Sequence, residues 1–392
     1  MLLYVHVPFC VRKCGYCAFH SGPFSTVAVA EYMELVLREM AGWGRALGRV
    51  PVETVFFGGG TPSLLEPGQI GAILEAAAGV FGLAADAEIT LEANPDSAVR
   101  PGFLDGVRRL GVNRLSLGVQ SLQDELLAML GRPHDGAQAR QAVHAARAAG
   151  FENLSMDLIW GLPGQDLPGW MRDLAEVVKL APDHLSCYGL SLEEGTPLAR
   201  QYQAGALSLP DEEACARMYL DGSEFLQSRG YAHYEISNHA RPGRESRHNQ
   251  GYWSGRDYLG LGPSAVSTLG DKRRTNPAGL EAYARAVVAG AAPDEVEFLS
   301  ARTRWQEMVM LALRTSRGLD LEKFMATTGT EFPWHLPAVE QLRSSGLVCL
   351  RSGHLQLTRK GMLVSNSVIE MVLGIVDHVT ADTVQGTYDR QH

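Results

Sequence analysis

Three cysteines lie close together near the amino terminus, at Cys10, Cys14 and Cys17. Three thiolates on one loop can each ligate one iron of a cubane cluster, which leaves the fourth iron without a protein ligand and open to a further molecule. A zinc knuckle is the alternative. Only His6 and His20 lie near enough in sequence to complete a tetrahedral zinc set, and neither has the usual spacing. The triad therefore favours an iron–sulfur cluster with an open iron.

Further candidate residues follow the next apolar segments of the chain. Gly59, Gly60 and Thr61 belong to the run GGGTP, where missing side chains allow the backbone to approach a ligand and donate N–H groups to it. A tight strand-to-helix turn is the alternative for such a run. Polar side chains then recur at the ends of three later apolar segments. Because sites in α/β barrels form at the carboxyl ends of strands, we expect one common cavity that is lined by Glu92, Gln120 and Asp157.

The segments that must position these residues alternate between strand and helix patterns. This order predicts a parallel sheet with right-handed crossovers, and nearly continuous apolar strands predict that both faces of the sheet are covered. A partial parallel (β/α)6 barrel of the α/β class fits six such units better than a closed barrel of eight. The predicted strands are 2–7, 53–58, 88–93, 113–119, 153–160 and 184–190, and the predicted helices are 26–47, 67–80, 100–110, 122–149 (split near Gly131 and Pro133) and 167–180.

The pattern changes twice further along the chain, which predicts three parts. Residues 1–195 form the barrel, 196–298 form a subsidiary α/β region that contains a clear helix at 210–228, and 299–392 form a carboxyl-terminal helical, winged-helix-like module. The predicted elements of that module are helices at 300–315, 319–327 and 335–345, followed by the short strands GLVCLR and HLQLT.

Charge and composition exclude some classes of function. The 392 residues are 45% hydrophobic and carry a formal net charge of −9 at pH 7, whereas a nucleic-acid binder needs a surplus of basic residues to neutralise phosphates. We therefore expect no nucleic-acid partner. No apolar run reaches the roughly 18 to 20 residues that span a bilayer, and the first residues lack the pattern of a signal peptide, so we expect a cytoplasmic location.

The C-x3-C-x2-C spacing of the cysteines resembles the radical S-adenosylmethionine (SAM) superfamily. The resemblance implies a 4Fe–4S cluster whose open iron is chelated by the methionyl group of SAM. It also implies which residues contact that cofactor. Core packing is the alternative for the two tyrosines and for the two residues on the last strand, and a solvated loop charge is the alternative for the arginine. The residues matched are Tyr4, Tyr16, Gly59, Gly60, Thr61, Glu92, Gln120, Arg132 (as the partner of a cofactor carboxylate) and Asp157, together with Gly189 and Leu190 on the last strand.

More narrowly, the chain resembles the oxygen-independent coproporphyrinogen III oxidase group. The shared segments YVHVPFC, FFGGGTPS, LEANPD, SLGVQS, MDLIWGLPGQ and HLSCYGL follow one another in the expected order. The group contains decarboxylating oxidases and haem chaperones. The oxidase pattern has a further cysteine where this chain has Phe19, and it begins with an extension before the first strand, whereas here the strand is expected from Leu2. We therefore expect the chaperone subgroup.

An H-N-x-x-Y-W motif carries the resemblance to the chaperones and implies haem binding by His248, Asn249, Tyr252 and Trp253. His248 can ligate haem iron, with Asn249 setting the imidazole tautomer, while the two aromatic rings contact the macrocycle. A hydrogen-bonded structural histidine is the alternative, and Cys215 or another histidine then becomes the candidate ligand.

The resulting prediction is a haem chaperone that holds haem as cargo. The alternatives are oxidative decarboxylation of a porphyrinogen and radical chemistry on haem itself. The expected partners are haem, a recipient haemoprotein and an electron donor such as a flavodoxin or ferredoxin. Peripheral membrane association and a monomeric or dimeric state are both compatible with the sequence.

Overall fold

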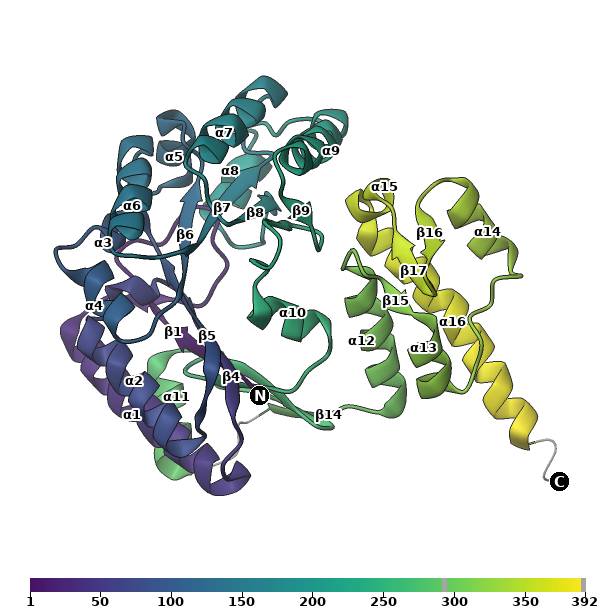
Figure 1. Ribbon diagram of the computed structural model, residues 1–392, viewed down its shortest axis with the longest axis horizontal. Helices are drawn as coiled ribbons and strands as arrows, with labels where there is room; N and C mark the ends of the chain where they lie inside the picture. The colour runs from purple at the N-terminus through teal and green to yellow at the C-terminus, as the bar shows by residue number, and fades with distance from the viewer. Residues whose placement is uncertain (291–294, 389–392) are drawn as a thin grey trace.

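A parallel sheet forms the centre of the molecule, in a computed structural model that describes residues 1–290 and 295–388. Six neighbouring strands run parallel and in chain order, and their buried apolar residues form the main core (Figure 1). The six predicted strands and the open α/β barrel are confirmed. The strands are β1 (Leu2–Val7), β4 (Val52–Gly59), β5 (Leu83–Ala93), β6 (Arg114–Gln120), β7 (Asn153–Trp160) and β8 (His184–Gly189).

Helices follow the strands and cover the outer face of this sheet, with two α-helices after β5 and two after β6. The long helical stretch predicted at 122–149 is divided as expected, because Gly131 ends the first helix with a φ of 72° and the Asp135 side chain caps the second by accepting the Gln138 N–H. The helices are α1 (Thr26–Leu47), η1 (Pro62–Leu64), α2 (Pro67–Val80), α3 (Pro95–Ala98), α4 (Phe103–Arg109), α5 (Asp124–Leu130), α6 (Gly136–Ala148) and α7 (Leu167–Lys179).

Both edges of the barrel sheet are extended by residues from the region predicted to be subsidiary. The strand β11 (Tyr258–Leu261) pairs in parallel with β1, and β10 (Asn238–Ala240) pairs antiparallel with β8. Within the described residues, the strands of the region 196–298 therefore belong to the barrel sheet, because β10 and β11 pair with the N–H and C=O groups that its edges expose and the other strands extend from them. Its other elements are α8 (Pro197–Gln203), α9 (Glu212–Ser228), β9 (Ala232–His233), α10 (Arg247–Trp253), β12 (Val266–Leu269), β13 (Lys272–Thr275), α11 (Leu280–Ala289) and β14 (Glu295–Phe298).

The carboxyl-terminal module stands beside the barrel and has a hydrophobic core of its own (Figure 1). The predicted helices and two strands are present, and a short strand, β15, joins those two in a three-stranded sheet. The elements are α12 (Ala301–Leu313), β15 (Leu319–Asp320), α13 (Leu321–Thr328), α14 (Pro337–Ser344), β16 (Val348–Arg351), β17 (His354–Leu357), α15 (Arg359–Leu363) and α16 (Ser365–Tyr388).

Backbone hydrogen bonds attach the module to the edge of the barrel. The Ile236 N–H donates to the Arg314 carbonyl at 3.1 Å, and the Ser316 N–H donates to the Tyr234 carbonyl at 3.0 Å. These contacts place α12 next to α10, which lies between the barrel and the module (Figure 1).

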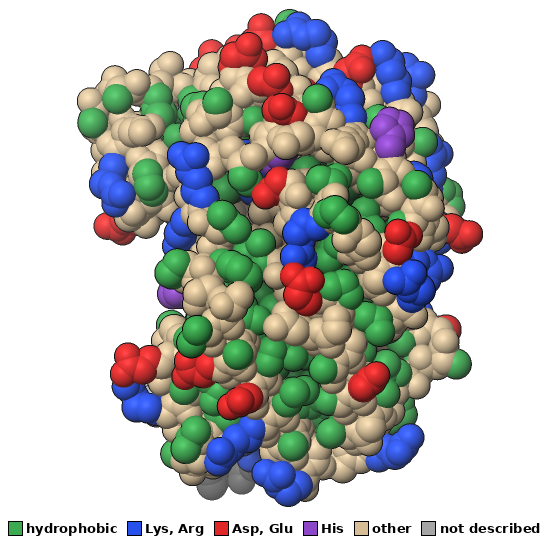
Figure 2. All heavy atoms as spheres, turned by 90° about the vertical axis from the view of Figure 1, so that its left-hand side faces the viewer, with side chains coloured by type: hydrophobic (Ala, Val, Ile, Leu, Met, Phe, Trp, Pro, Cys, Tyr) green, Lys and Arg blue, Asp and Glu red, His purple; other side chains and the backbone are tan. Residues whose placement is uncertain are grey.

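The outer face of the barrel helices mixes basic and acidic side chains, with hydrophobic side chains between them (Figure 2). No broad field of one charge appears on that face. Among the described residues, no helix is both long enough and apolar enough to cross a membrane.

Candidate functional site

The three cysteines lie on the loop between β1 and α1. A short parallel pair, β2 (Phe9–Cys10) with β3 (Gly22–Pro23), closes this loop. The Gly15 N–H donates to the Leu130 carbonyl at 3.0 Å, which attaches the loop to α5. All three thiols are free, with Cys14 buried and the other two half-buried. The fold thus presents three available sulfur ligands on one anchored loop.

Donors and a cation next to the sulfurs fit a cluster with negatively charged thiolates. The Thr61 hydroxyl donates to Cys10 Sγ at 3.5 Å, and Nη1 of Arg132 donates to Cys14 Sγ at 3.4 Å. Burial raises the pKa of the Cys17 thiol, and the neighbouring Cys14 and Cys10 raise it further. Among the described residues, no three His, Cys, Asp or Glu side chains converge as ligands of a single ion. A cubane has no need of such convergence, since each cysteine binds its own iron.

The glycine run is required by packing between β4 and the cysteine loop. A Cβ at Gly60 would lie 2.5 Å from the Phe9 carbonyl oxygen, and one at Gly59 would lie 2.7 Å from the His6 ring. Gly59 also has a φ of 112°, a conformation that favours glycine. The next residue along, Thr61, donates its N–H to the Phe9 carbonyl at 2.8 Å. The run therefore places the Thr61 hydroxyl beside the sulfur of Cys10.

Two acidic side chains, Glu92 on β5 and Asp157 on β7, lie on the two strands that flank β6. Burial, followed by the nearby charge of Asp157, raises the pKa of Glu92 to about 8. Burial also raises the pKa of Asp157, although Ser116 donates to both of its carboxylate oxygens at 3.2 Å. Arg114, on β6, is a fully buried cation near both acids and was not singled out from the sequence. A cationic ligand such as the sulfonium and ammonium groups of SAM fits this acidic environment.

A strained residue and an arginine lie at the end of β6. Gln120 has a φ of 66°, where the register between β6 and β7 also shifts. Such backbone strain is common at ligand sites. Nη2 of Arg132 donates to Asn94 Oδ1 and to the Gly118 carbonyl, each at 2.6 Å. Its Nε is buried without a partner in the described part of the chain, so one donor is free for a carboxylate.

Both predicted tyrosines lie at this site. The Tyr4 hydroxyl is 3.1 Å from Nδ1 of His6, and its ring packs on Phe56 with centroids 6.2 Å apart. Tyr16 lies beside Arg132 and the cysteines, and burial raises its pKa. The structure thus places Tyr4 and Tyr16 with the other residues matched to the cofactor.

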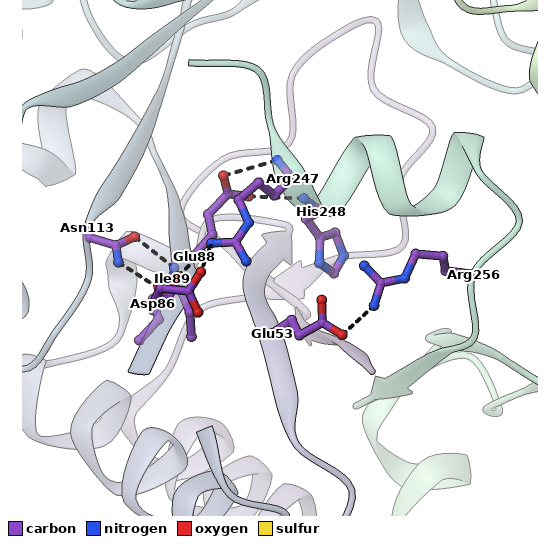
Figure 3. A network of polar contacts seen from close by, with 9 residues as sticks. Glu53, Asp86, Glu88, Ile89, Asn113, Arg247, His248 and Arg256 are labelled. Atoms are coloured by element: carbon purple, nitrogen blue, oxygen red, sulfur yellow. Dashed lines mark hydrogen bonds and ion pairs between the residues drawn. The ribbon is translucent and has the colours of Figure 1, made fainter. Parts of the chain in front are cut away.

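The helix α10 carries the H-N-x-x-Y-W motif and is held to the barrel through Glu88 on β5. One carboxylate oxygen of Glu88 accepts the Arg247 N–H at 3.1 Å, and the other accepts the His248 N–H at 3.0 Å (Figure 3). The sequence patterns did not single out Glu88. Because β5 also carries Asp86, Thr90 and Glu92, its sequence carries no signal that sets Glu88 apart.

The His248 side chain is buried and both of its ring nitrogens are hydrogen-bonded. Nδ1 lies 2.7 Å from the Thr54 hydroxyl, and Nε2 lies 2.9 Å from the Tyr252 hydroxyl. Burial lowers the pKa of His248 to about 3, so the ring is neutral. The expectation that Asn249 sets the imidazole tautomer is wrong, because Thr54 and Tyr252 occupy both nitrogens.

A cavity of about 1220 Å³ lies between the cysteine loop, α10 and the module. Ligand pockets usually measure about 300–1,000 Å³, so this one accommodates a large ligand. Tyr252 and Trp253 line it, whereas His248 lies behind Tyr252. Within the described residues, the buried indole Nε1 of Trp253 has no hydrogen-bond acceptor. Phe19 and His20 line the cavity from the cysteine loop.

Comparisons with known proteins agree with this arrangement. Residues 4–180 match the family described as Radical SAM superfamily, and residues 299–364 match the HemN C-terminal domain. A protein of Mycobacterium tuberculosis named heme chaperone HemW is 36% identical over 95% of this chain and 94% of its own length. A heme chaperone HemW of Synechocystis is 40% identical over 84% of this chain and 81% of its own length. The solved structure of coproporphyrinogen III oxidase (HemN) from Escherichia coli is similar, with a TM-score of 0.82 and 27% identity over 95% of this chain and 89% of its own.

Proposed function

The chain belongs to the radical SAM superfamily, in the family that contains the HemW proteins, and from this premise we propose that it binds haem and delivers it to recipient haemoproteins. The observation that carries the proposal is the large cavity that opens between the cysteine loop and the module. Aromatic and apolar side chains line its walls, as a porphyrin requires. The similarity to proteins named heme chaperones supports haem as the cargo.

In this proposal the resident cofactors are a 4Fe–4S cluster and SAM. Cys10, Cys14 and Cys17 hold the cluster. When both cofactors are bound, the cluster and SAM together supply one-electron chemistry at the sulfonium. The polar residues at the strand ends bind SAM: Glu92 and Asp157 face its cationic groups, Arg132 faces its carboxylate, and Tyr4, Tyr16, Gly59, Gly60, Thr61 and Gln120 surround it.

Haem is proposed to occupy the cavity, with Tyr252 and Trp253 against the macrocycle. His248 supports this wall from behind by holding the Tyr252 hydroxyl, so that iron ligation by His248 first requires the 2.9 Å contact to Tyr252 to break. His20 and Met308 are potential iron ligands that already line the cavity. Asn249 follows His248 on α10 and remains part of the proposed haem site.

The proposal includes the partners that such a role needs. An electron donor such as a flavodoxin or ferredoxin reduces the cluster, and a haemoprotein accepts the cargo. We place the chain in the cytoplasm, because three thiols kept free for ligation favour a reducing compartment. Peripheral association with a membrane would bring it to membrane-bound recipients, and the active form is a monomer or a dimer.

The second candidate is oxidative decarboxylation of coproporphyrinogen III, which the structural similarity to the Escherichia coli oxidase favours. In that reaction the same cavity would hold the porphyrinogen. Phe19, exposed on the cysteine loop where the oxidase pattern has a further cysteine, favours haem carriage instead.

The test is anaerobic reconstitution with iron and sulfide, followed by three assays on the same preparation. Haem is titrated by absorbance, transfer is measured to apomyoglobin as a probe acceptor, and coproporphyrinogen is supplied with SAM and a reductant. Saturable binding of haem with transfer, and without vinyl-bearing product, is expected. Multiple turnovers of coproporphyrinogen would overturn the chaperone role as the main function, and absence of haem binding would overturn it outright.

A further inference from the structure

Three exposed cations of the module line the cavity. Arg304 comes from α12, Arg317 from the turn after it and Lys323 from α13. Within the ranges that the structure describes, none of them forms an ion pair. In a chain with a net charge of −9, three exposed cations on one wall that form no ion pair need an explanation.

Several of the other charged residues that line the cavity have partners. Arg273 binds Glu307 through both terminal nitrogens, at 2.7 and 2.9 Å. The Asp320 carboxylate caps α13 by accepting the N–H groups of residues 322 and 323 at 3.0 Å each. Asp257 accepts the Gly270 N–H at 3.1 Å. Arg317 helps to lower the pKa of Asp320, and Glu245 and Asp257 also line the cavity, but within the described residues none of these acids forms an ion pair with the three cations.

The same wall also carries apolar surface. Met308 and Leu311 follow Arg304 at spacings of four and seven residues, so all three lie on one face of α12, and all three line the cavity. The rings of Tyr252 and Trp253 line the cavity from α10, which packs against α12. An apolar space next to free cations suits a flat apolar ligand that carries carboxylates.

We propose that the module recognises the carboxylates of the bound tetrapyrrole through Arg304, Arg317 and Lys323. This inference rests on the proposed function and adds a role for the module. Guanidinium groups match carboxylates with paired donors, and an ammonium group adds a point charge. The module thus favours a tetrapyrrole with free carboxylates over its ester. The aromatic side chains of α10 supply contact area to both ligands alike.

The test compares haem with haem dimethyl ester, in which both propionates are blocked. Dissociation constants for both ligands are measured by absorbance with the full-length, cluster-loaded protein and with a triple variant, Arg304→Gln, Arg317→Gln and Lys323→Gln. Arg351→Gln is the matched control, because Arg351 is exposed on β16 of the same module and is not among the cavity-lining residues. The single variants replace the triple variant if it fails to fold.

We expect the wild type and the control to bind haem about tenfold more tightly than the ester, because exposed ion pairs are individually weak. The triple variant should bind both ligands equally, with an unchanged affinity for the ester. The preference of the wild type should also weaken with added salt, since exposed charges are screened. A preference retained by the triple variant, or absent from the wild type, would overturn the inference alone, whereas failure of the wild type to bind either ligand would overturn the proposed function.

Discussion

Nε2 of His248 lies 2.9 Å from the hydroxyl of Tyr252, one turn further along α10. The other ring nitrogen lies 2.7 Å from the Thr54 hydroxyl on β4. The imidazole therefore links the barrel sheet to a side chain that lines the cavity. This arrangement gives the histidine of the H-N-x-x-Y-W motif a supporting role in the structure, which can be separated experimentally from iron ligation.

Replacement of His248 by Ala should destabilise the protein by about 2–4 kcal/mol. The change removes one buried and one partly buried hydrogen bond, together with the packing on the Phe56 ring, whose centroid is 5.1 Å away. Urea denaturation of the wild type and the variant measures the difference. Haem affinity should fall as well, while the haem absorbance spectrum keeps its position, because a supporting residue does not alter the iron's ligands.

Tyr252→Phe is the matched variant for this experiment, since it removes only the hydroxyl that His248 holds. It should cost about 1 kcal/mol and weaken haem binding less than His248→Ala does. A changed ligand-field spectrum in His248→Ala, with a normal spectrum in Tyr252→Phe, would instead establish His248 as the iron ligand.

Replacement of Glu88 by Ala should release α10 from the barrel. The carboxylate accepts two backbone N–H groups at the start of that helix, and their loss should lower the free energy of unfolding by about 2–3 kcal/mol. Haem affinity should drop while cluster iron content stays normal. Asp86→Asn is the control, because Asp86 is exposed and pairs only with the Arg247 side chain among the described residues. Equal effects of the two substitutions would contradict a specific role of Glu88.

Single replacement of Cys10, Cys14 or Cys17 by Ala should abolish assembly of a stable cluster. Reconstituted wild type should hold about four iron and four sulfide per chain, and each variant much less. Cys349→Ala, in the module, should assemble normally. Retention of zinc, with no acid-labile sulfide, by the wild type after reconstitution would favour the zinc alternative.

Affinity for SAM should increase as the pH rises toward 8. The pKa of Glu92 is raised from 4.5 to about 8 by burial and by Asp157, so the unliganded carboxyl is mostly protonated at neutral pH and must lose its proton to face a cation. Below that pKa, the affinity should rise by up to about tenfold per pH unit. Isothermal titration with SAM between pH 6 and 9 measures the effect, and Glu92→Gln should bind weakly without this dependence.

The raised pKa of Glu92 also affects stability. Affinity for SAM should rise with pH, whereas stability should fall. The folded, unliganded protein keeps the Glu92 proton up to about pH 8, whereas the unfolded chain loses it near 4.5. The unfolded state therefore binds fewer protons in this range, and this residue's contribution to stability falls as the pH rises from about 4.5 to 8. Glu92→Gln should flatten that fall in thermal unfolding measured across the same range. An equally steep fall in the variant would show that Glu92 is already ionised.

The sequence alone determined the parts of this protein that depend on local spacing. The cysteine triad, the six βα units and the division of the helix near Gly131 all follow from patterns within a few residues of one another, because side-chain periodicity and capping act over one or two turns. The family resemblance rested on the same short segments, and the comparisons confirmed it.

Only the tertiary structure decided which distant residues meet. Thr54 and His248 are 194 positions apart, and Glu88 and His248 are 160 apart, so neither pairing leaves a local signal in the chain. The pairing of β11 with β1 likewise arose from the open edge of the sheet. The same holds for the cavity between α10 and α12, whose walls come from separate parts of the chain. The sequence therefore predicted the ligands of a cluster, and packing between distant segments determined that His248 supports the cavity wall.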